Sequence, residues 1–504
     1  MRSEANSSTS SSPAPKSERW SRLGQQTATA GLFLFSAFAP HSIAAAEISL
    51  AIVATGWLVR TVATKKTGFH RTPFDLPICL FYLWTVASSF LSEEPAISVP
   101  KIQSASVIFL FYLIQAVVTR RTAVMLVAVM ILSGVAGTLS SVYDLARGRG
   151  IVIESISPES PLQPLHLREG DVIWRISGRR IYSVADLDRA IRNSPAGTKL
   201  NVGMISQGEQ VDHPGLVVTD TIKRRTSPSG IIGNRVTHRF RASGWTPHYV
   251  TFSEILQILA QLAFGLALAN VINHGLNRWS KLAFAAAALL ALGVALTAMR
   301  TALMALAIGI CVISFRSLKQ RALVLTLAGV LVMLLFGAFV VYQTRAANAL
   351  WLQDPSSSLR FQVATTGLKR IMFHPLFGHG MDSMHRHWAE WGFPGKEIIH
   401  MHSTPLQLVF DRGFPALIFW LWIMAVFWRT ATRAEKSQRE SRDTNRYGIL
   451  LGATGAVAAV FASSLVNYNF GDEEVMLVFW WLMGIVAVLS EVNSKQTSNP
   501  VTSR

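Results

Sequence analysis

The segment HMHSTPLQLVFDRG, residues 400–413, places His400 and His402 just before a long apolar run. Two such histidines could bind a metal, act as a catalytic base, or close a loop where a membrane span begins. Their i, i+2 spacing suits a strand or a loop, because it does not put both rings on one face of a helix. The H-E-x-x-H motif of zinc proteases does not occur in the sequence. The pattern therefore predicts no metal at this pair.

The same segment closes a histidine-rich stretch, since six of the thirteen histidines lie between residues 374 and 402. The ordinary pKa of histidine is close to neutral pH, so its ring can take a proton from a hydroxyl group. A single loop histidine is more often structural. The interpretation as a base therefore depends on the charged groups nearby.

Two arginines are candidate partners. Arg300, in LTAMRTALMALAIGI, lies where one apolar run ends and the next begins, and Arg360 follows DPSSS in a long polar connection. A helix that begins after DPSSS, capped by Ser357 or Ser358, would carry Arg360 in its first turns. Arg300 could be an interfacial anchor whose side chain reaches the lipid headgroups. Alternatively, both guanidinium groups could bind a diphosphate, because their planar fork bonds phosphate oxygens in pairs and stays charged.

Membrane helices must position these residues. The chain has 504 residues, of which 50% are hydrophobic and 15% charged, and its mean hydropathy is +0.34. Apolar runs of about 18 to 22 residues, long enough to cross a hydrocarbon core, recur along the chain. They predict an all-α polytopic membrane protein of about 12 transmembrane helices with a small inserted α+β domain. The predicted spans lie near residues 27–40, 42–62, 74–91, 102–119, 122–143, 251–272, 280–298, 301–315, 322–343, 404–428, 447–467 and 473–491.

The net charge of +18 is distributed between these spans. No basic groove with interleaved aromatic residues occurs, which argues against nucleic acid as a partner. Basic connections alternate along the chain, so the positive-inside rule places them and both termini in the cytoplasm. The two long connections, residues 147–250 and 344–403, then lie on the periplasmic side of the inner membrane. Cys79 and Cys311 lie inside apolar runs and are expected to pack as small hydrophobic residues.

Short alternating strands (IVIESI, DVIWRI and KLNVGMI) and an amphipathic helix at residues 184–193 predict a small α+β domain in the first long connection. With the segment LREGDVIWRISGRRI, residues 147–218 resemble PDZ domains of the bacterial type. The resemblance implies a groove beside that helix, where a C-terminal peptide of an envelope protein adds as an extra strand. The alternative is a spacer that binds no peptide. The implied groove residues are Gly150, Ile151, Val152 and Ile153.

A second resemblance is carried by the segments LTAMRTALMALAIGI, LRFQVATTGLKRIMFHPLFGHGMDSM and HMHSTPLQLVFDRGFPALIFWLWI. In this order they resemble the O-antigen ligase and polymerase superfamily over roughly residues 230–430. The HPLFGHG and DRGFPAL portions are the most specific. The resemblance implies that Arg300 and Arg360 bind a diphosphate and that His402 is the catalytic base. His400 does not align with that base.

The chain departs from the family pattern beside these residues. Met299 precedes the first arginine, where the family usually has Ser, and Ser403 follows the histidine, where the family usually has Asn. Both changes leave the charges in place and alter how the side chains are positioned. An inserted PDZ-like domain is not part of the usual pattern.

The predicted organisation follows from the spans and the two resemblances. It comprises a disordered cytoplasmic tail (1–26), N-terminal transmembrane helices (27–146), the PDZ-like domain (147–220), a basic linker with central transmembrane helices (221–343), a periplasmic catalytic loop (344–403), C-terminal transmembrane helices (404–491) and a cytoplasmic tail (492–504).

The resemblance to O-antigen ligases implies a metal-independent, inverting glycosyltransferase of lipopolysaccharide or other envelope polysaccharide synthesis, without a cofactor. Its donor would be a polyprenyl-diphosphate-linked glycan and its acceptor a sugar hydroxyl on a lipid or glycan at the periplasmic face. A repeat-unit polymerase and a protein O-glycosyltransferase are alternatives within the superfamily. A non-catalytic membrane scaffold that displays a PDZ module is an alternative of another class. An intramembrane metalloprotease is disfavoured because the zinc motif is absent.

Overall fold

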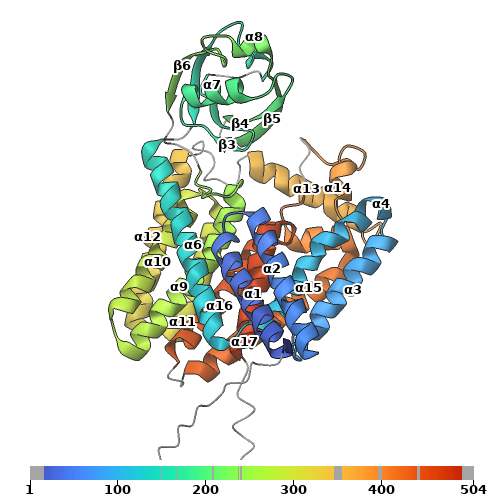
Figure 1. The fold of residues 1–504 in the computed structure, drawn as a ribbon, viewed down its shortest axis with the longest axis vertical. Helices are drawn as coiled ribbons and strands as arrows, with labels where there is room; N and C mark the ends of the chain where they lie inside the picture. Colours follow the sequence, from blue (N-terminus) through green and yellow to red (C-terminus); the bar gives the residue numbers. More distant parts are fainter. Residues whose placement is uncertain are drawn as a thin grey trace, which may run out of the picture.

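A bundle of long helices carries a small β domain at one end, which we call the domain-bearing end (Figure 1). The structure is a computed structural model that describes residues 16–490 except 149, 166, 168, 207–208, 237, 239–240, 345–354, 396–399 and 440–442. The short helices α13 and α14 lie at the same end of the bundle as the small domain (Figure 1).

The apolar runs of the sequence form the helices of the bundle. Within the described residues, ten helical segments are long and apolar enough to cross a membrane. Two of the twelve predicted spans are not among them, because α3 has only 17 residues and α1 begins with the polar sequence KSERWSRLGQQ. The protein is therefore a multi-pass membrane protein with about ten candidate spans. The bundle helices are α1 (Lys16–Phe38), α2 (Ile43–Thr64), α3 (Asp75–Leu91), α4 (Pro95–Ser98), η1 (Val99–Ile108), α5 (Phe109–Val117), α6 (Arg120–Arg147), α9 (Tyr249–His274), α10 (Arg278–Leu296), α11 (Arg300–Ser317), α12 (Gln320–Thr344), α15 (Thr404–Arg439), α16 (Thr444–Ser464) and α17 (Glu473–Ser490).

Helices α9 and α16 form the close-packed centre of the bundle. A Cβ atom at Gly265 of α9 would lie 2.4 Å from the backbone of both Gly448 and Gly452 on α16. Small residues of this kind let two membrane helices approach backbone to backbone. The two helices are therefore held in a fixed relation to each other at this contact.

Helix α15 contains a sharp kink at the DRGFP sequence. Gly413 has a φ of 77°, in the left-handed region that favours glycine, and Pro415 follows it inside the helix. The HPLFGHG segment docks on this kink, since Phe414 N–H donates to Pro375 O at 2.9 Å. His379 N–H donates to Phe410 O at 2.7 Å. The two most specific portions of the sequence resemblance thus lie against each other.

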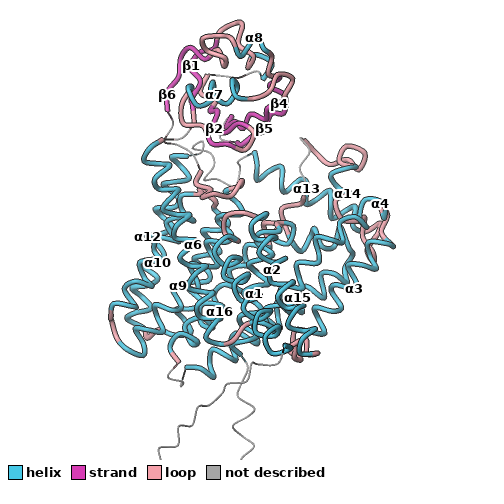
Figure 2. Tube along the Cα trace, in the orientation of Figure 1, coloured by secondary structure: helices cyan, strands magenta, loops and turns pink. Residues whose placement is uncertain are grey.

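One six-stranded sheet forms the small domain, with the order β5-β4-β2-β1-β6 and β3 paired to β2. Figure 2 shows the strands gathered above the helices. Helix α7 packs Leu187 and Ile191 into the domain core. The elements are β1 (Ile151–Ile156), β2 (Val172–Ile176), β3 (Arg179–Arg180), α7 (Val184–Asn193), β4 (Lys199–Ser206), β5 (Glu209–Val217), α8 (Asp220–Lys223) and β6 (Ile231–Val236).

The domain stands on the end of α6. Asp144 of α6 accepts hydrogen bonds from Arg180 and, at 3.1 Å, from Tyr182 Oη. The Arg147 guanidinium lies 4.4 Å from the centre of the Tyr182 ring. These contacts join the small domain directly to a membrane helix.

Strand β6 corrects two predictions about this domain. The domain does not end at residue 220, because β6 (Ile231–Val236) is part of its sheet. The predicted peptide groove is also not open, since β6 pairs antiparallel with β1 along the edge where the peptide was expected to add. The groove residues Gly150, Ile151, Val152 and Ile153 are buried. The chain covers its own strand edge, which is a common protection against unwanted pairing.

The segment before β6 follows α7. Ser229 N–H donates to Asp188 Oδ1 at 2.8 Å, and Arg192 donates to Thr226 O at 2.6 Å. Residues 226–236 therefore run along α7 and then along β1, the course predicted for a bound peptide.

Candidate active site

Helix α13 (Pro355–Ile371) carries Arg360 to the histidine turn. It begins at Pro355, inside the DPSSS sequence and slightly earlier than expected, so Arg360 lies in its second turn. Val363 packs in one buried cluster with Met401, the residue between the two histidines. Gly367 leaves room for that side chain, because a Cβ atom there would lie 2.4 Å from Met401 Cε. The packing thus fixes α13 beside residues 400–402.

The turn that holds the two histidines has an unusual backbone. His402 has a φ of 52°, in the left-handed region, which costs a residue other than glycine about 1 to 3 kcal/mol. Hydrogen bonds on both sides hold this conformation. Met401 N–H donates to Gln407 Oε1 at 2.8 Å, and Thr404 N–H donates to Asn467 O at 3.1 Å. Strain of this kind is often found where a side chain must be aimed at a reacting group.

The electrostatic environment keeps both imidazoles neutral. Their ring centroids lie 4.4 Å apart at an interplanar angle of 80°. Burial, followed by the positive charge of Arg360, lowers the pKa of His400 to about 4. Burial, followed by the charges of His400 and Arg360, lowers the pKa of His402 to about 2. Arg360 is therefore close enough to act on both rings, and both are unprotonated at neutral pH.

A hydrogen bond fixes the tautomer of His400. His400 Nδ1 accepts a hydrogen bond from His402 N–H at 3.3 Å. A neutral imidazole whose Nδ1 is an acceptor carries its proton on Nε2. His400 is thus a hydrogen-bond donor at Nε2, so its geometry does not suit proton abstraction at that atom. This tautomer argues against His400 as the base, and the base that the sequence resemblance implies is His402.

Arg300 is the first residue of α11, where it is half-buried. Its neighbour Met299 accepts a hydrogen bond at Sδ from Ser253 Oγ of α9 at 3.0 Å. Arg241 holds the preceding turn, since its Nε donates to Thr297 O at 2.9 Å. The structure thus anchors Arg300 on α9, and Arg360 is the arginine whose charge acts on the histidine rings.

A buried carboxylate on α9 connects the start of α11 with the histidine turn. It was not among the residues predicted from the sequence. Glu254, beside Ser253, accepts hydrogen bonds from Gln257 Nε2 at 2.6 Å and Ser463 Oγ at 3.0 Å. Asn467 Nδ2 also donates to Glu254, at 3.2 Å, and the Asn467 carbonyl holds Thr404 at the start of α15. The carboxylate therefore links the start of α11 to the histidine turn. An acidic residue inside an apolar run is itself a signal of function, and that signal was present in the sequence.

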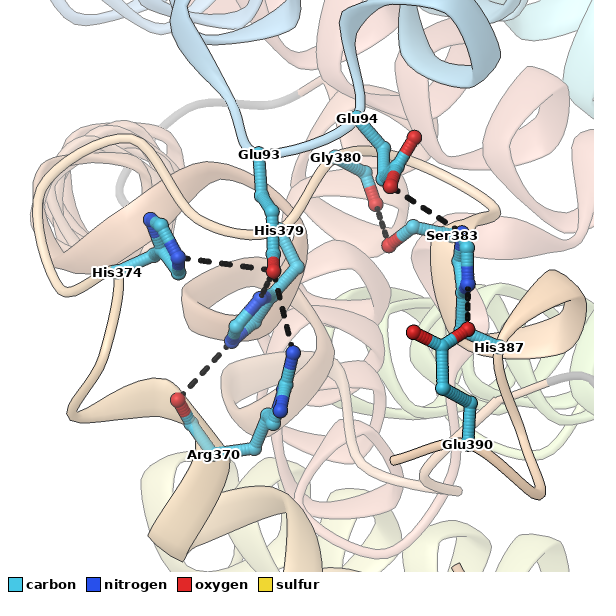
Figure 3. A network of polar contacts seen from close by, with 9 residues as sticks. All are labelled: Glu93, Glu94, Arg370, His374, His379, Gly380, Ser383, His387 and Glu390. Atoms are coloured by element: carbon cyan, nitrogen blue, oxygen red, sulfur yellow. Dashed lines mark hydrogen bonds and ion pairs between the residues drawn. The ribbon is translucent and has the colours of Figure 1, made fainter. Parts of the chain in front are cut away.

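A second group of histidines lies on the loop before α14 (Ser383–Arg386), as Figure 3 shows. Within the described residues, the ligand atoms of Glu93, His374 and His379 lie within 4.8 Å of one another, which is the spacing of a candidate metal set. Arg370 donates to the same Glu93 carboxylate at 3.1 Å, so a fixed positive charge already occupies part of that site. A metal cation would be repelled there.

The hydrogen bonds of this group indicate a structural brace. His379 contacts Glu93 through Nδ1, and its Nε2–H donates to Arg370 O at 3.0 Å. Burial alone would raise the pKa of Glu93, but its contacts with His379, Arg370 and His374 lower it below its usual value. Beside this group His387 bridges Glu94 and Glu390 at 3.3 and 2.7 Å (Figure 3). The long loop is thus tied to the connection that follows α3.

Comparison with known proteins gives a family match over the part of the chain that holds these residues. Residues 285–421 match the model of the O-antigen ligase family, and this range contains Arg300, Arg360 and His402. The match and the apolar helices together support an O-antigen ligase-type membrane glycosyltransferase.

One curated protein, the magnetosome formation protease MamE of Magnetospirillum gryphiswaldense, is 28% identical over 88 residues. The similar stretch covers 18% of this chain and 10% of that protein. This chain therefore spans only a small part of that relative.

Proposed function

We propose that the protein transfers a glycan from a polyprenyl-diphosphate carrier to a sugar hydroxyl at the domain-bearing end of the bundle, on the periplasmic face of the inner membrane. The observation that carries the proposal is the packing of helix α13, which holds Arg360, against the turn of His400 and His402, within the region that matches the O-antigen ligase family. A cation beside a neutral base suits a reaction that develops negative charge on a leaving diphosphate.

In the proposed reaction His402 takes the proton of the acceptor hydroxyl. The hydroxyl oxygen forms a bond to the anomeric carbon while the bond from that carbon to the diphosphate oxygen breaks. The electron pair leaves with the polyprenyl diphosphate, whose charge Arg360 and Arg300 stabilise through paired hydrogen bonds. A single displacement inverts the anomeric configuration.

The low pKa of His402 has a function in this scheme. Before the donor binds, burial of the ring, followed by the charges of His400 and Arg360, lowers its pKa and keeps it unprotonated. Once a diphosphate neutralises the guanidinium charge, the same ring becomes more basic, because the positive charge no longer opposes its protonation. The donor thus prepares the base for the acceptor.

Transfer should be independent of divalent metal ions. We expect protein purified and treated with EDTA to keep its activity, because the arginines supply the charge that a metal ion would otherwise provide. Transfer of a labelled glycan in detergent, with and without added Mg²⁺ or Mn²⁺, measures this. Loss of activity with EDTA and recovery with either ion would contradict the proposal.

The acid side of the pH profile gives a second test. The pKa of His402 is lowered to about 2 in the free protein, so its base form persists throughout the range above that value. We expect kcat/KM to stay nearly constant between pH 8 and pH 5, whereas a base of ordinary pKa would lose about 30-fold at pH 5. Donor and acceptor must be chosen without groups that titrate in this range. A fall of about 30-fold centred near pH 6.5 would contradict the low pKa of the base.

Loss of the gene in cells tests the function and identifies the acceptor. If the protein is a ligase, the deletion strain should accumulate lipid-linked polymer, while loss of a repeat-unit polymerase should leave single lipid-linked repeat units. An unchanged pool of lipid-linked glycans and of glycosylated envelope proteins would favour a scaffold and reject the proposal.

A further inference from the structure

A cavity of about 270 Å³ lies beside the histidine turn, between η1, α15 and the segment that leads into α17. His400 lines this cavity, and its ring centroid is 4.4 Å from that of His402. The volume is close to the lower limit of small-molecule sites, which is about 300 Å³. The cavity is thus large enough for a small polar ligand next to the proposed base.

The charges of the lining do not suit an anion. Lys101, which lines the cavity, already forms a 2.9 Å ion pair with Asp382. Two further carboxylates, Asp411 and Glu473, line the same space, against the single additional cation of Arg412. The lining therefore has no excess of positive charge, unlike a diphosphate site.

Several lining groups are instead suited to hydroxyl groups. Trp480 is fully buried, and its indole N–H has no hydrogen-bond partner among the described residues. The Nε–H of buried Arg412 likewise has none within the described part of the chain. Buried donors without partners are costly, but these two nitrogens have almost no exposed surface, so a ligand oxygen reaches them only where neighbouring side chains move aside.

Acceptors and aromatic faces complete the lining. Asp411 contributes side-chain oxygens, as does Gln407, whose Oε1 also accepts the Met401 N–H. Phe81 and Phe470 contribute an edge-to-face aromatic pair with ring centroids 6.3 Å apart. Donors, acceptors and aromatic faces in one cavity match a neutral sugar ring, which has hydroxyls around its edge and apolar C–H faces.

We infer that this cavity binds the sugar unit of the acceptor and presents one of its hydroxyls to His402. The inference rests on the proposed function and assigns the donor and the acceptor to different sides of the histidine pair. The diphosphate of the donor lies on the Arg360 side of the histidine pair, and the acceptor sugar lies on the side of His400, Gln407 and Trp480.

The first test fills the cavity and leaves the histidines untouched. Ala105 of η1 lines the cavity, and its neighbour Ser106 is exposed and does not. We expect Ala105→Trp to raise the acceptor KM roughly ten-fold, as loss of one or two hydrogen bonds would, and to leave the donor KM unchanged. Ser106→Trp is the matched control and should leave both values unchanged. Ser104→Phe, on the rim of the cavity, is a second variant in case Ala105→Trp does not fold.

The outcomes separate the alternatives. An increase in donor KM with an unchanged acceptor KM would assign the cavity to the donor and overturn the inference. Unchanged kinetics in well-folded Ala105→Trp and Ser104→Phe would also overturn it.

A binding measurement distinguishes failure of this inference from failure of the proposed function. Saturation-transfer NMR on the purified full-length protein would use the oligosaccharide fraction released from the envelope glycans of the same cells. We expect sugar signals with the wild type and with Ser106→Trp, strongly reduced signals with Ala105→Trp, and no displacement by inorganic pyrophosphate. Sugar binding of this kind without any glycan transfer would reject the proposed function and retain a sugar site. Transfer by the wild type without sugar binding at the cavity would reject the sugar site alone.

Discussion

Replacing His402 with alanine is expected to lower glycan transfer by about 10² to 10⁴, the usual cost of removing a general base. His400 does not replace this base, because its Nδ1 accepts the His402 N–H and its Nε2 carries the proton. His400→Ala should therefore keep a substantial part of kcat and act mainly on the acceptor KM, since that ring lines the cavity. Initial rates in membranes with matched protein levels measure both effects.

His385, an exposed histidine of the connection between α12 and α15, provides the matched control. His385→Ala should transfer glycan at the rate of the wild type. Equal and severe loss of kcat in His400→Ala and His402→Ala would indicate that the two rings act as one unit, as in a two-histidine metal site, and would contradict the assignment of the base.

Arg360→Lys is expected to lower kcat/KM for the donor by about 10² to 10³, the cost of losing a positioned charge donor in a transition state. Lysine keeps the positive charge but cannot form the two parallel hydrogen bonds of a guanidinium group with a diphosphate. Arg360→Ala should be at least as severe. It should also raise the pKa of His402, because the positive charge that lowers that pKa is removed.

Lys369, an exposed cation of the same helix α13, is the control for non-specific effects of charge. Lys369→Ala should leave the donor KM and kcat unchanged. Wild-type kinetics in Arg360→Lys would show that paired hydrogen bonds from this side chain do not contribute to catalysis.

The membrane helices were predictable because each apolar run has the length of a span. The exceptions have physical explanations: α3 is only 17 residues long, and α1 begins with polar residues.

The position of Arg360 beside the histidines was expected only through a resemblance. The position of α13 against the turn depends on Gly367 and Met401, which pack together across a long loop and show no periodic pattern in the sequence.

The remaining features depend on pairings between distant segments. Strand β6 lies on β1 although 80 residues separate Ile151 from Ile231, and no local pattern in IIGNRV identifies that partner. The cavity likewise combines residues of α3, η1, α15 and α17. Glu254 is different, because a carboxylate inside an apolar run is visible in the sequence, although its partners Asn467 and Ser463 are not.

The most direct test of the proposed function is transfer by the purified protein in lipid vesicles, with a labelled polyprenyl-diphosphate-linked glycan and an envelope acceptor. The products to be followed are the labelled acceptor and the released polyprenyl diphosphate. The wild type should form both in equal amounts without added metal, and folded His402→Ala should form neither above background. Absence of transfer by the wild type with every donor and acceptor fraction of its own cells, or equal transfer by His402→Ala, would contradict the account.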